Sequence, residues 1–171
     1  MIFFSSTPSS PLHRTFRGFT LVEVVVATSM ITIALVSIAL YYKKVLDVSE
    51  DTTRRIQSGF LLEEGLEATK LLRDEGWNAN IGSLSTMTNY YLTWSGTFWR
   101  TTTVPLKVEN VFTRTVKFSD VRRDGVDSIA DTGTLDSGTK KVTVSVTWLV
   151  RGGNGMATDT AETYLTNLFS N

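Results

Sequence analysis

The chain has 171 residues, of which 17 are basic and 17 acidic, so its formal net charge is zero. This length holds at most one ordinary domain beyond a leader and an anchor, and the charge balance gives no indication of nucleic-acid binding. Cysteine is absent, which excludes disulfides and thiolate metal sites. The single histidine, His13, lies among the first 18 residues, so the rest of the chain has no histidine for catalysis.

Residues 1–18 form a polar segment that is rich in serine, threonine and proline. Its prolines Pro8 and Pro11 disfavour a helix, because the residue before a proline is restricted to extended conformations. Arg14 and Arg17 place positive charge at the end of the segment. We expect an unstructured tail here, and its removal would leave 15 basic and 17 acidic residues, a net charge of −2.

The next segment, from Phe19 to Tyr42, is a run of 24 residues that contains one charge, Glu23. A helix of roughly 20 apolar residues is long enough to cross a bilayer. A carboxylate inside such a span costs about 2.5–3.5 kcal/mol on insertion scales, so it is by default a functional hypothesis. The run therefore predicts a membrane helix whose glutamate has a function.

Two simpler interpretations of this segment remain open. A cleaved secretory signal has an apolar region of about 7–15 residues and a small-x-small cleavage site after it. This run is longer, carries a glutamate, and ends in Tyr41-Tyr42-Lys43-Lys44 without such a site. A plain single-pass anchor satisfies the length but leaves Glu23 without a function.

Taken together, the Gly18-Phe19 pair, the apolar run after it and the early Glu23 resemble the N-terminus of the type IV pilin and pseudopilin family. The resemblance implies that a membrane-embedded prepilin peptidase cuts between Gly18 and Phe19 and that the new Phe19 amino group is methylated. It also implies that Glu23 guides the assembly of subunits into a helical filament. A glycine leaves the peptidase room to approach, and a buried Glu23 is stabilised if the Phe19 amine of a neighbouring subunit pairs with it.

The same resemblance implies a location and a set of partners. The chain would be a single-pass protein of the bacterial inner (cytoplasmic) membrane, and later part of an extracellular or periplasmic filament. Its partners would be the lipid bilayer before assembly, the prepilin peptidase, an inner-membrane assembly platform, and other pilin subunits through the N-terminal helix. The orientation rests on the resemblance, because Lys43, Lys44, Arg54 and Arg55 follow the span and the positive-inside count does not place the N-terminus in the cytoplasm.

Residues 43–76 are expected to continue the helix as an amphipathic segment that packs under a head domain. Apolar residues recur every three or four positions, which is typical of one helix face. Gly76 then predicts the end of a helix that runs from Phe19 to Glu75. The first track consists of Val45, Val48, Thr52, Ile56 and Phe60, and a second beside it of Leu61, Gly65, Ala68 and Leu72, widened by Leu62 and Leu66.

Residues 77–171 are expected to form a β-rich head. A hairpin is predicted around Ser95-Gly96, and alternating apolar residues predict half-buried strands with turns between them. The expected strands are Tyr90–Trp94, Phe98–Val104, Val108–Val121 (Phe112, Val116 and Phe118 on one face, interrupted by Arg114), Lys140–Val150 (Val142, Val144, Val146, Trp148 and Val150 on one face) and Thr160–Phe169. The predicted fold class is therefore α+β, with a long N-terminal helix packed on a C-terminal antiparallel sheet. The expected division is 1–18, 19–42, 43–76 and 77–171.

Three features of the head were weighed as binding sites. The aspartates between Asp120 and Gly138 could bind calcium, but their spacing fits no EF-hand loop and Asp-Gly pairs are ordinary turn residues, so we favour solvated turns. The stretch from Gly152 to Gly155 opens no helix and has no lysine, which argues against a phosphate loop. We favour hairpin core over an adhesive patch for the aromatic residues, which are Tyr90, Tyr91, Trp94, Phe98 and Trp99.

These observations favour a structural subunit over an enzyme, because the sequence contains no nucleophile–base pair and no metal-ligand set. No cofactor and no metal is expected. The interpretation we favour is a minor pilin or pseudopilin of a type IV pilus-like filament. Within the family, the alternative is a pseudopilin of a type II secretion or DNA-uptake machine. Outside it, the alternative is a membrane-anchored β domain that binds a ligand without polymerising.

Overall fold

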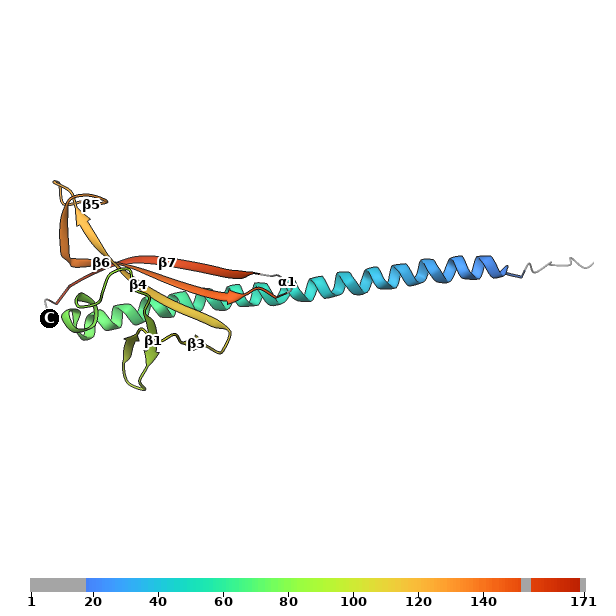
Figure 1. The fold of residues 1–171 in the computed structure, drawn as a ribbon, viewed down its shortest axis with the longest axis horizontal. Coiled ribbons are helices and arrows are strands. Elements are labelled where there is room, and N and C mark those ends of the chain that lie inside the picture. The colour runs from blue at the N-terminus through green and yellow to red at the C-terminus, as the bar shows by residue number, and fades with distance from the viewer. Residues whose placement is uncertain (1–17, 152–154, 170–171) are drawn as a thin grey trace, which may run out of the picture. The chain divides into compact units, whose positions relative to one another are not determined.

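A computed structural model describes residues 18–151 and 155–169, which divide into two compact units at Lys44 and Val45. One long helix, α1 (Leu21–Glu75), and a short π-helical turn (Asn78–Gly82) precede all the strands (Figure 1). The strands are β1 (Tyr91–Trp94), β2 (Trp99–Thr102), β3 (Lys107–Val108), β4 (Phe112–Arg123), β5 (Ile129–Ala130), β6 (Thr134–Leu149) and β7 (Met156–Thr166).

The start of α1 differs by two residues from the expected one. The helix begins at Leu21 rather than at Phe19, because Thr20 acts as its N-cap: the Thr20 hydroxyl oxygen accepts a hydrogen bond from the Glu23 amide at 3.3 Å. Glu23 occupies the first turn, where a negative charge interacts favourably with the helix dipole. The capping pair Thr20 and Glu23 therefore fixes the helix start.

The later part of α1 packs one face against the sheet, as the second apolar track predicted. Gly65, Ala68 and Leu72 are buried in this face, together with Ser58 and Thr69. Leu61, Leu62 and Leu66 pack at its margins. Small residues at the centre of the face let the sheet approach closely: a Cβ on Gly65 would lie 2.7 Å from Cγ1 of Val144.

The first track does not pack under the head, which corrects that expectation. Ile56 and Phe60 are 59% and 66% exposed. Residues on a helix advance by about 100° each, so Phe60 lies about 140° around the helix from Gly65, the centre of the packed face. The sheet covers one side of the helix, and this track lies on another.

The end of α1 lies at Glu75 as predicted, but not through a left-handed glycine at Gly76. The chain continues in right-handed helical conformation at Trp77 (φ −59°, ψ −53°) into the π-helical turn Asn78–Gly82. The Leu72 carbonyl in the last turn accepts a hydrogen bond from the Gly76 amide at 3.3 Å and a second one from the Asn80 side chain at 3.2 Å. The helix thus ends by a change of pitch and a side-chain cap.

The head contains an antiparallel sheet with the strand order β3–β4–β6–β7, and β5 pairs with β4 (Figure 1). β1 and β2 form a separate hairpin that pairs Trp94 with Trp99, as the Ser95-Gly96 signal predicted. A bridge between Tyr90 and Val116 links the start of this hairpin to β4. The fold class is therefore α+β, a 55-residue helix packed on a C-terminal antiparallel sheet, as predicted.

One face of the sheet forms the core and the other is polar. Seven of the predicted inward residues of β4 and β6 are buried, namely Phe112, Val116, Phe118, Val142, Val144, Val146 and Trp148. Val150, which was expected on the same face, lies just beyond the end of β6 at Leu149 and is only half-buried. On the outer face, hydroxyls of β6 and β7 pair across the strands, as Ser145 does with Thr160 and Thr147 with Thr158. This division follows the alternation of the sequence, since neighbouring residues of a strand point to opposite faces.

The limits of several strands differ from the expected ones. The expected strand Val108–Val121 is divided: β3 ends at Val108, a turn with positive φ at Glu109 and Asn110 follows, and β4 begins at Phe112 and pairs back with β3. β2 covers Trp99–Thr102 rather than Phe98–Val104.

β6 begins at Thr134 rather than at Lys140, and β7 covers Met156–Thr166 rather than Thr160–Phe169. The pairing of β4 with β6 shifts at Asp120/Val121, and beyond this irregularity Val121 pairs with Asp136. These extensions are polar and rest on backbone pairing and ion pairs, so no apolar alternation marked them.

Candidate functional site

The predicted cleavage bond lies just before α1, in exposed backbone. Gly18 and Phe19 are outside the helix, and the Phe19 side chain is 81% exposed. A Cβ placed on Gly18 would have no atom within 4 Å, so nothing in the described part of the chain shields this bond. The geometry leaves the Gly18–Phe19 bond open to a peptidase, and cleavage there stays a prediction. Residues 1–17 of the expected leader, with His13, Arg14 and Arg17, lie outside the described residues.

Glu23 lies one turn into α1, on exposed surface. Its backbone amide is bound to Thr20, and no lysine or arginine in residues 18–151 or 155–169 forms an ion pair with its carboxylate. The capping role uses the Glu23 amide and the helix dipole, not a partner for the carboxylate. A cation supplied from outside this chain would therefore find the carboxylate accessible.

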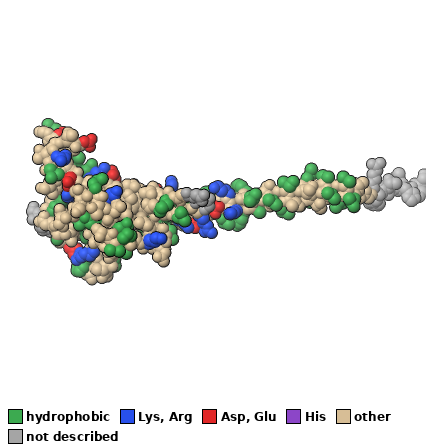
Figure 2. Space-filling model, in the orientation of Figure 1, with side chains coloured by type: hydrophobic (Ala, Val, Ile, Leu, Met, Phe, Trp, Pro, Cys, Tyr) green, Lys and Arg blue, Asp and Glu red, His purple; other side chains and the backbone are tan. Residues whose placement is uncertain are grey.

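Each residue of the segment from Leu21 to Lys44 is exposed, so apolar side chains face solvent all around this part of α1. Figure 2 shows such hydrophobic side chains on one face of it. Its serine and threonine hydroxyls are satisfied within the helix: each donates to a backbone carbonyl three or four residues earlier. Polar groups in hydrocarbon must find such internal partners. These hydroxyls belong to Thr28, Ser29, Thr32 and Ser37. By length and composition, α1 can cross a membrane.

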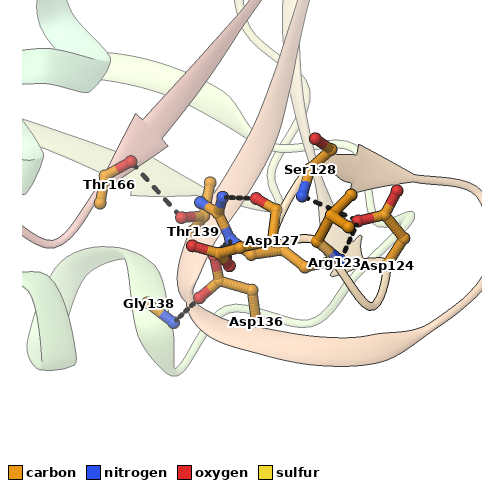
Figure 3. Close-up of polar contacts among 9 residues, drawn as sticks. Arg123, Asp124, Asp127, Ser128, Asp136, Gly138, Thr139 and Thr166 are labelled. Carbon is orange, nitrogen blue, oxygen red and sulfur yellow. Dashed lines mark hydrogen bonds and ion pairs between the residues drawn. The ribbon is translucent and has the colours of Figure 1, made fainter.

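The aspartate-rich segment between β4 and β6 is built from turns and ion pairs (Figure 3). Asp124 accepts hydrogen bonds from the amides of Val126 and Ser128, both at 2.9 Å. Asp136 accepts from Arg123 Nε at 2.7 Å and from the Gly138 amide at 2.9 Å. The hydrogen bond donated by Arg123 lowers the pKa of Asp136, and the hydrogen bond donated by the Thr139 hydroxyl lowers it further.

This arrangement favours the turn interpretation over calcium. Among residues 18–151 and 155–169, no three histidine or acidic side chains are grouped closely enough to hold a metal ion. Asp120 is paired with Lys140 at 2.5 Å, and Arg123 binds both Asp136 and Asp127. The expected loop from Asp120 to Gly138 is in part a small sheet of β4, β5 and β6. The glycine-rich stretch at 152–154 lies outside the described residues.

The aromatic residues of the hairpin divide into two groups. Tyr90 is buried and its ring meets that of Phe118 at 5.9 Å, so it belongs to the core as expected. Trp94 and Phe98 are 54% and 47% exposed, which corrects the hairpin-core interpretation for these two.

A partly buried ion pair joins α1 to β4. The Arg114 side chain is 4% exposed, and its guanidinium binds the Glu64 carboxylate at 2.7 Å and the Leu61 carbonyl at 3.3 Å. Its Nε has no partner among the described residues. The sequence marked Arg114 as an interruption of an apolar face, but nothing in the pattern singled out Glu64 as its partner.

Comparison with protein-family models, with curated proteins and with solved structures gives no match. The architecture itself is pilin-like: a long apolar N-terminal helix whose later half packs on a C-terminal antiparallel sheet. Function is therefore argued from the residues of this chain.

Proposed function

We propose that this chain is a structural subunit of a type IV pilus-like filament, a minor pilin or pseudopilin that is processed by prepilin peptidase and assembles through α1. One observation carries the proposal: the segment Leu21–Lys44 exposes apolar side chains on every side and carries one acidic residue, in its first turn. The apolar surface supports membrane insertion and packing in a filament, and the acidic residue supports the alignment of neighbouring subunits.

The apolar surface first requires a cover. A fully exposed valine, leucine or isoleucine forgoes about 1.5–3 kcal/mol that burial would provide. This segment has many such residues, among them Leu35 and Ile38, which are 61% and 63% exposed. A bilayer provides a cover before assembly, and packed helices of other subunits provide one afterwards. The internally satisfied hydroxyls suit both environments.

Glu23 separates a filament subunit from a plain anchor. In a bilayer its charge costs about 2.5–3.5 kcal/mol on insertion scales, and an anchor gains nothing in return. In a filament, the positive α-amino group of Phe19 from an adjacent subunit would pair with the Glu23 carboxylate. Such a pair would fix the axial position of each subunit against the next as it leaves the membrane.

The exposed track on the later part of α1 supports the same function. Val48, Ile56 and Phe60 continue an apolar surface beyond the segment that a bilayer would cover. A hollow of about 170 Å³ lies between Phe60 and the start of β4, lined also by Leu61 and Phe112. A membrane anchor leaves this track in water, whereas neighbouring subunits of a filament would cover it.

The proposed location and partners follow from this function. The chain would enter the bacterial inner membrane as a single-pass protein and would then join an extracellular or periplasmic filament. Its partners would be prepilin peptidase, an inner-membrane assembly platform and other subunits. A pilus, a type II secretion machine and a DNA-uptake machine would all use this geometry, and the neighbouring genes distinguish them: pilus assembly genes in one case, secretin and secretion genes in another.

Mass spectrometry of the chain from its native host tests the processing step. We expect a mature chain that begins at Phe19 with an N-methyl group. Gly18→Val should leave the precursor at full length, because a β-branched side chain would obstruct the peptidase. Thr15→Val is the matched control and should be processed normally. An intact Met1 terminus from a host with active prepilin peptidase would contradict the proposal.

A further inference from the structure

An aromatic hollow of about 190 Å³ lies between the end of α1 and the hairpin of β1 and β2. The tryptophan rings that flank it, Trp94 and Trp99, are paired across the hairpin with centroids 5.4 Å apart and planes at 58°. The residues that matter to its chemistry are Leu71 and Glu75 of α1 and Trp94, Thr97, Phe98 and Trp99 of the hairpin.

The exposed rings of this hollow are not needed for the core. Tyr90 and Leu92 provide the buried residues of this part of the chain, each 7% exposed. Trp94 and Phe98 keep about half of their surface in water. Large aromatic side chains that remain exposed around a concave surface are characteristic of binding sites.

Guanidinium groups lie over two of the rings, those of Phe98 and Trp99. The Arg114 guanidinium lies 5.5 Å from the centre of the Trp99 ring, and the Arg100 guanidinium lies 4.8 Å from the centre of the Phe98 ring. Arg100 also binds Glu75 at 2.6 Å, which ties the hairpin to the end of α1. A site whose rings are already fixed loses little conformational entropy when it binds a ligand.

The charges around the hollow are matched among themselves. Glu75 is paired with Arg100, and Glu64 is paired with Arg114. A charged ligand would therefore meet no uncompensated opposite charge and would have to break one of these pairs. The electrostatics favour a neutral ligand.

Hydrogen-bonding groups at the hollow favour a polar ligand over an apolar one. Among the described residues, the indole N–H groups of Trp94 and Trp99 and the Thr97 hydroxyl form no hydrogen bond. An apolar ligand would remove these groups from water without replacing their hydrogen bonds, which costs free energy. A ligand with apolar C–H faces and a rim of hydroxyls would match both the rings and these groups.

We propose that this hollow binds one ring of a neutral saccharide, which stacks on Trp94 and Trp99 and is hydrogen-bonded by their N–H groups and by Thr97. The hollow is small, about 190 Å³, so we expect it to hold one ring rather than a longer segment of a saccharide. The site is on the head and does not depend on the filament function.

Saturation-transfer NMR on the full chain tests this proposal, in a detergent that contains no sugar. The probes are three neutral trisaccharides: maltotriose, cellotriose and the trimer of N-acetylglucosamine. We expect saturable transfer to the C–H protons of one ring from at least one probe. Trp94→Ala should weaken binding about tenfold, since an aromatic stacking contact contributes on the order of 1 kcal/mol or more.

Matched variants distinguish the hollow from adventitious stacking. Thr97→Val, which preserves side-chain shape, should weaken binding several-fold without loss of folding. Tyr164→Ala removes an aromatic ring of similar exposure from β7 and should leave the affinity unchanged. Absence of saturation with all three sugars, equal affinity in Trp94→Ala, or tighter binding of tetramethylammonium chloride at the same rings would each overturn the proposal.

Discussion

The two halves of α1 have different relations to the rest of the chain. From Leu21 to Lys44 every residue is exposed, whereas the half from Val45 to Glu75 buries Ser58, Gly65, Ala68, Thr69 and Leu72. The first half is apolar on all sides, and the second has one packed face with small residues at its centre. The distribution of apolar residues around the helix therefore differs between the halves: this chain's own sheet covers the packed face of the second half, and under the proposed function lipid or other subunits would cover the first.

Val144→Asp should reduce the stability of the head more than any other change, because it disrupts the packing of the sheet on the second half of α1. Val144 is fully buried on β6 and lies against Gly65 of α1. An unpaired charge at this position costs several kcal/mol, so we expect the head to unfold, as measured by near-ultraviolet circular dichroism on heating. Ser145→Asp places the same charge on the outer face and should melt within about 1 kcal/mol of the wild type. Equal melting of Val144→Asp and wild type would show that the face is assigned wrongly.

Glu64→Gln should rank second, since it leaves Arg114 buried without its counter-charge. Loss of one partner of a buried pair costs about 3–5 kcal/mol, and we expect about 1–3 kcal/mol here because Glu64 is 47% exposed. Arg114→Met, which removes the charge and keeps the volume, should cost less than Glu64→Gln. Glu63→Gln, an exposed neighbour, serves as the control in chemical denaturation. A larger cost for Arg114→Met than for Glu64→Gln would refute this ranking.

Two glycines of α1 give opposite predictions for the same substitution. Gly65→Ala would place a methyl group 2.7 Å from Val144, and overpacking costs about 1–3 kcal/mol. Alanine is favoured over glycine in a helix by about 1 kcal/mol, so we expect Gly65→Ala to lose up to about 2 kcal/mol of stability. Gly59→Ala has no atom within 4 Å of the new group and should gain about 1 kcal/mol. Equal increases in the melting temperature of Gly65→Ala and Gly59→Ala would mean that the sheet does not lie this close to α1 at Gly65.

The smallest effect is expected at Asp136, which lies away from the packed face. Arg123 lowers the pKa of this carboxyl below its usual value of about 4. A lowered pKa in the folded state adds stability above that usual value, and this contribution is lost as the pH falls through the folded-state pKa. Asp136→Asn should therefore lose less stability than the wild type as the pH falls below about 4, by less than about 1 kcal/mol. Asp131→Asn is the control, and an identical pH profile for Asp136→Asn and wild type would contradict the assignment.

The sequence predicted the elements that have strong periodicity and missed those that rest on individual polar contacts. The end of α1 at Glu75 and the hairpin around Gly96 followed from glycine signals in the sequence, and most of the inward faces of β4 and β6 followed from the alternation of apolar residues. The pairing of Glu64 with Arg114 depends on which turn of α1 faces β4. Spacing within one element does not fix how two elements are placed against each other.

The candidate site was predictable to a similar degree. The exposed Gly18–Phe19 bond and the early Glu23 were identified from residue types and order. The Thr20 cap was missed, although the Thr-x-x-Glu spacing of Thr20 and Glu23 is the signature of a capping box. The aromatic residues of the hollow were identified as a possible adhesive patch, but hairpin core was favoured, because the exposure of Trp94 depends on how the hairpin meets α1.

The fraction of subunits in sheared filaments, relative to processed chain in the membrane, tests the central claim most directly. We compare wild type with Glu23→Val, which removes the carboxylate, and with Thr20→Ala, which removes the cap and keeps the carboxylate. The account predicts that Glu23→Val accumulates as processed chain in the membrane and is lost from filaments, while Thr20→Ala is incorporated. Undiminished incorporation of Glu23→Val, or equal loss of both variants, would contradict the proposal that Glu23 aligns neighbouring subunits.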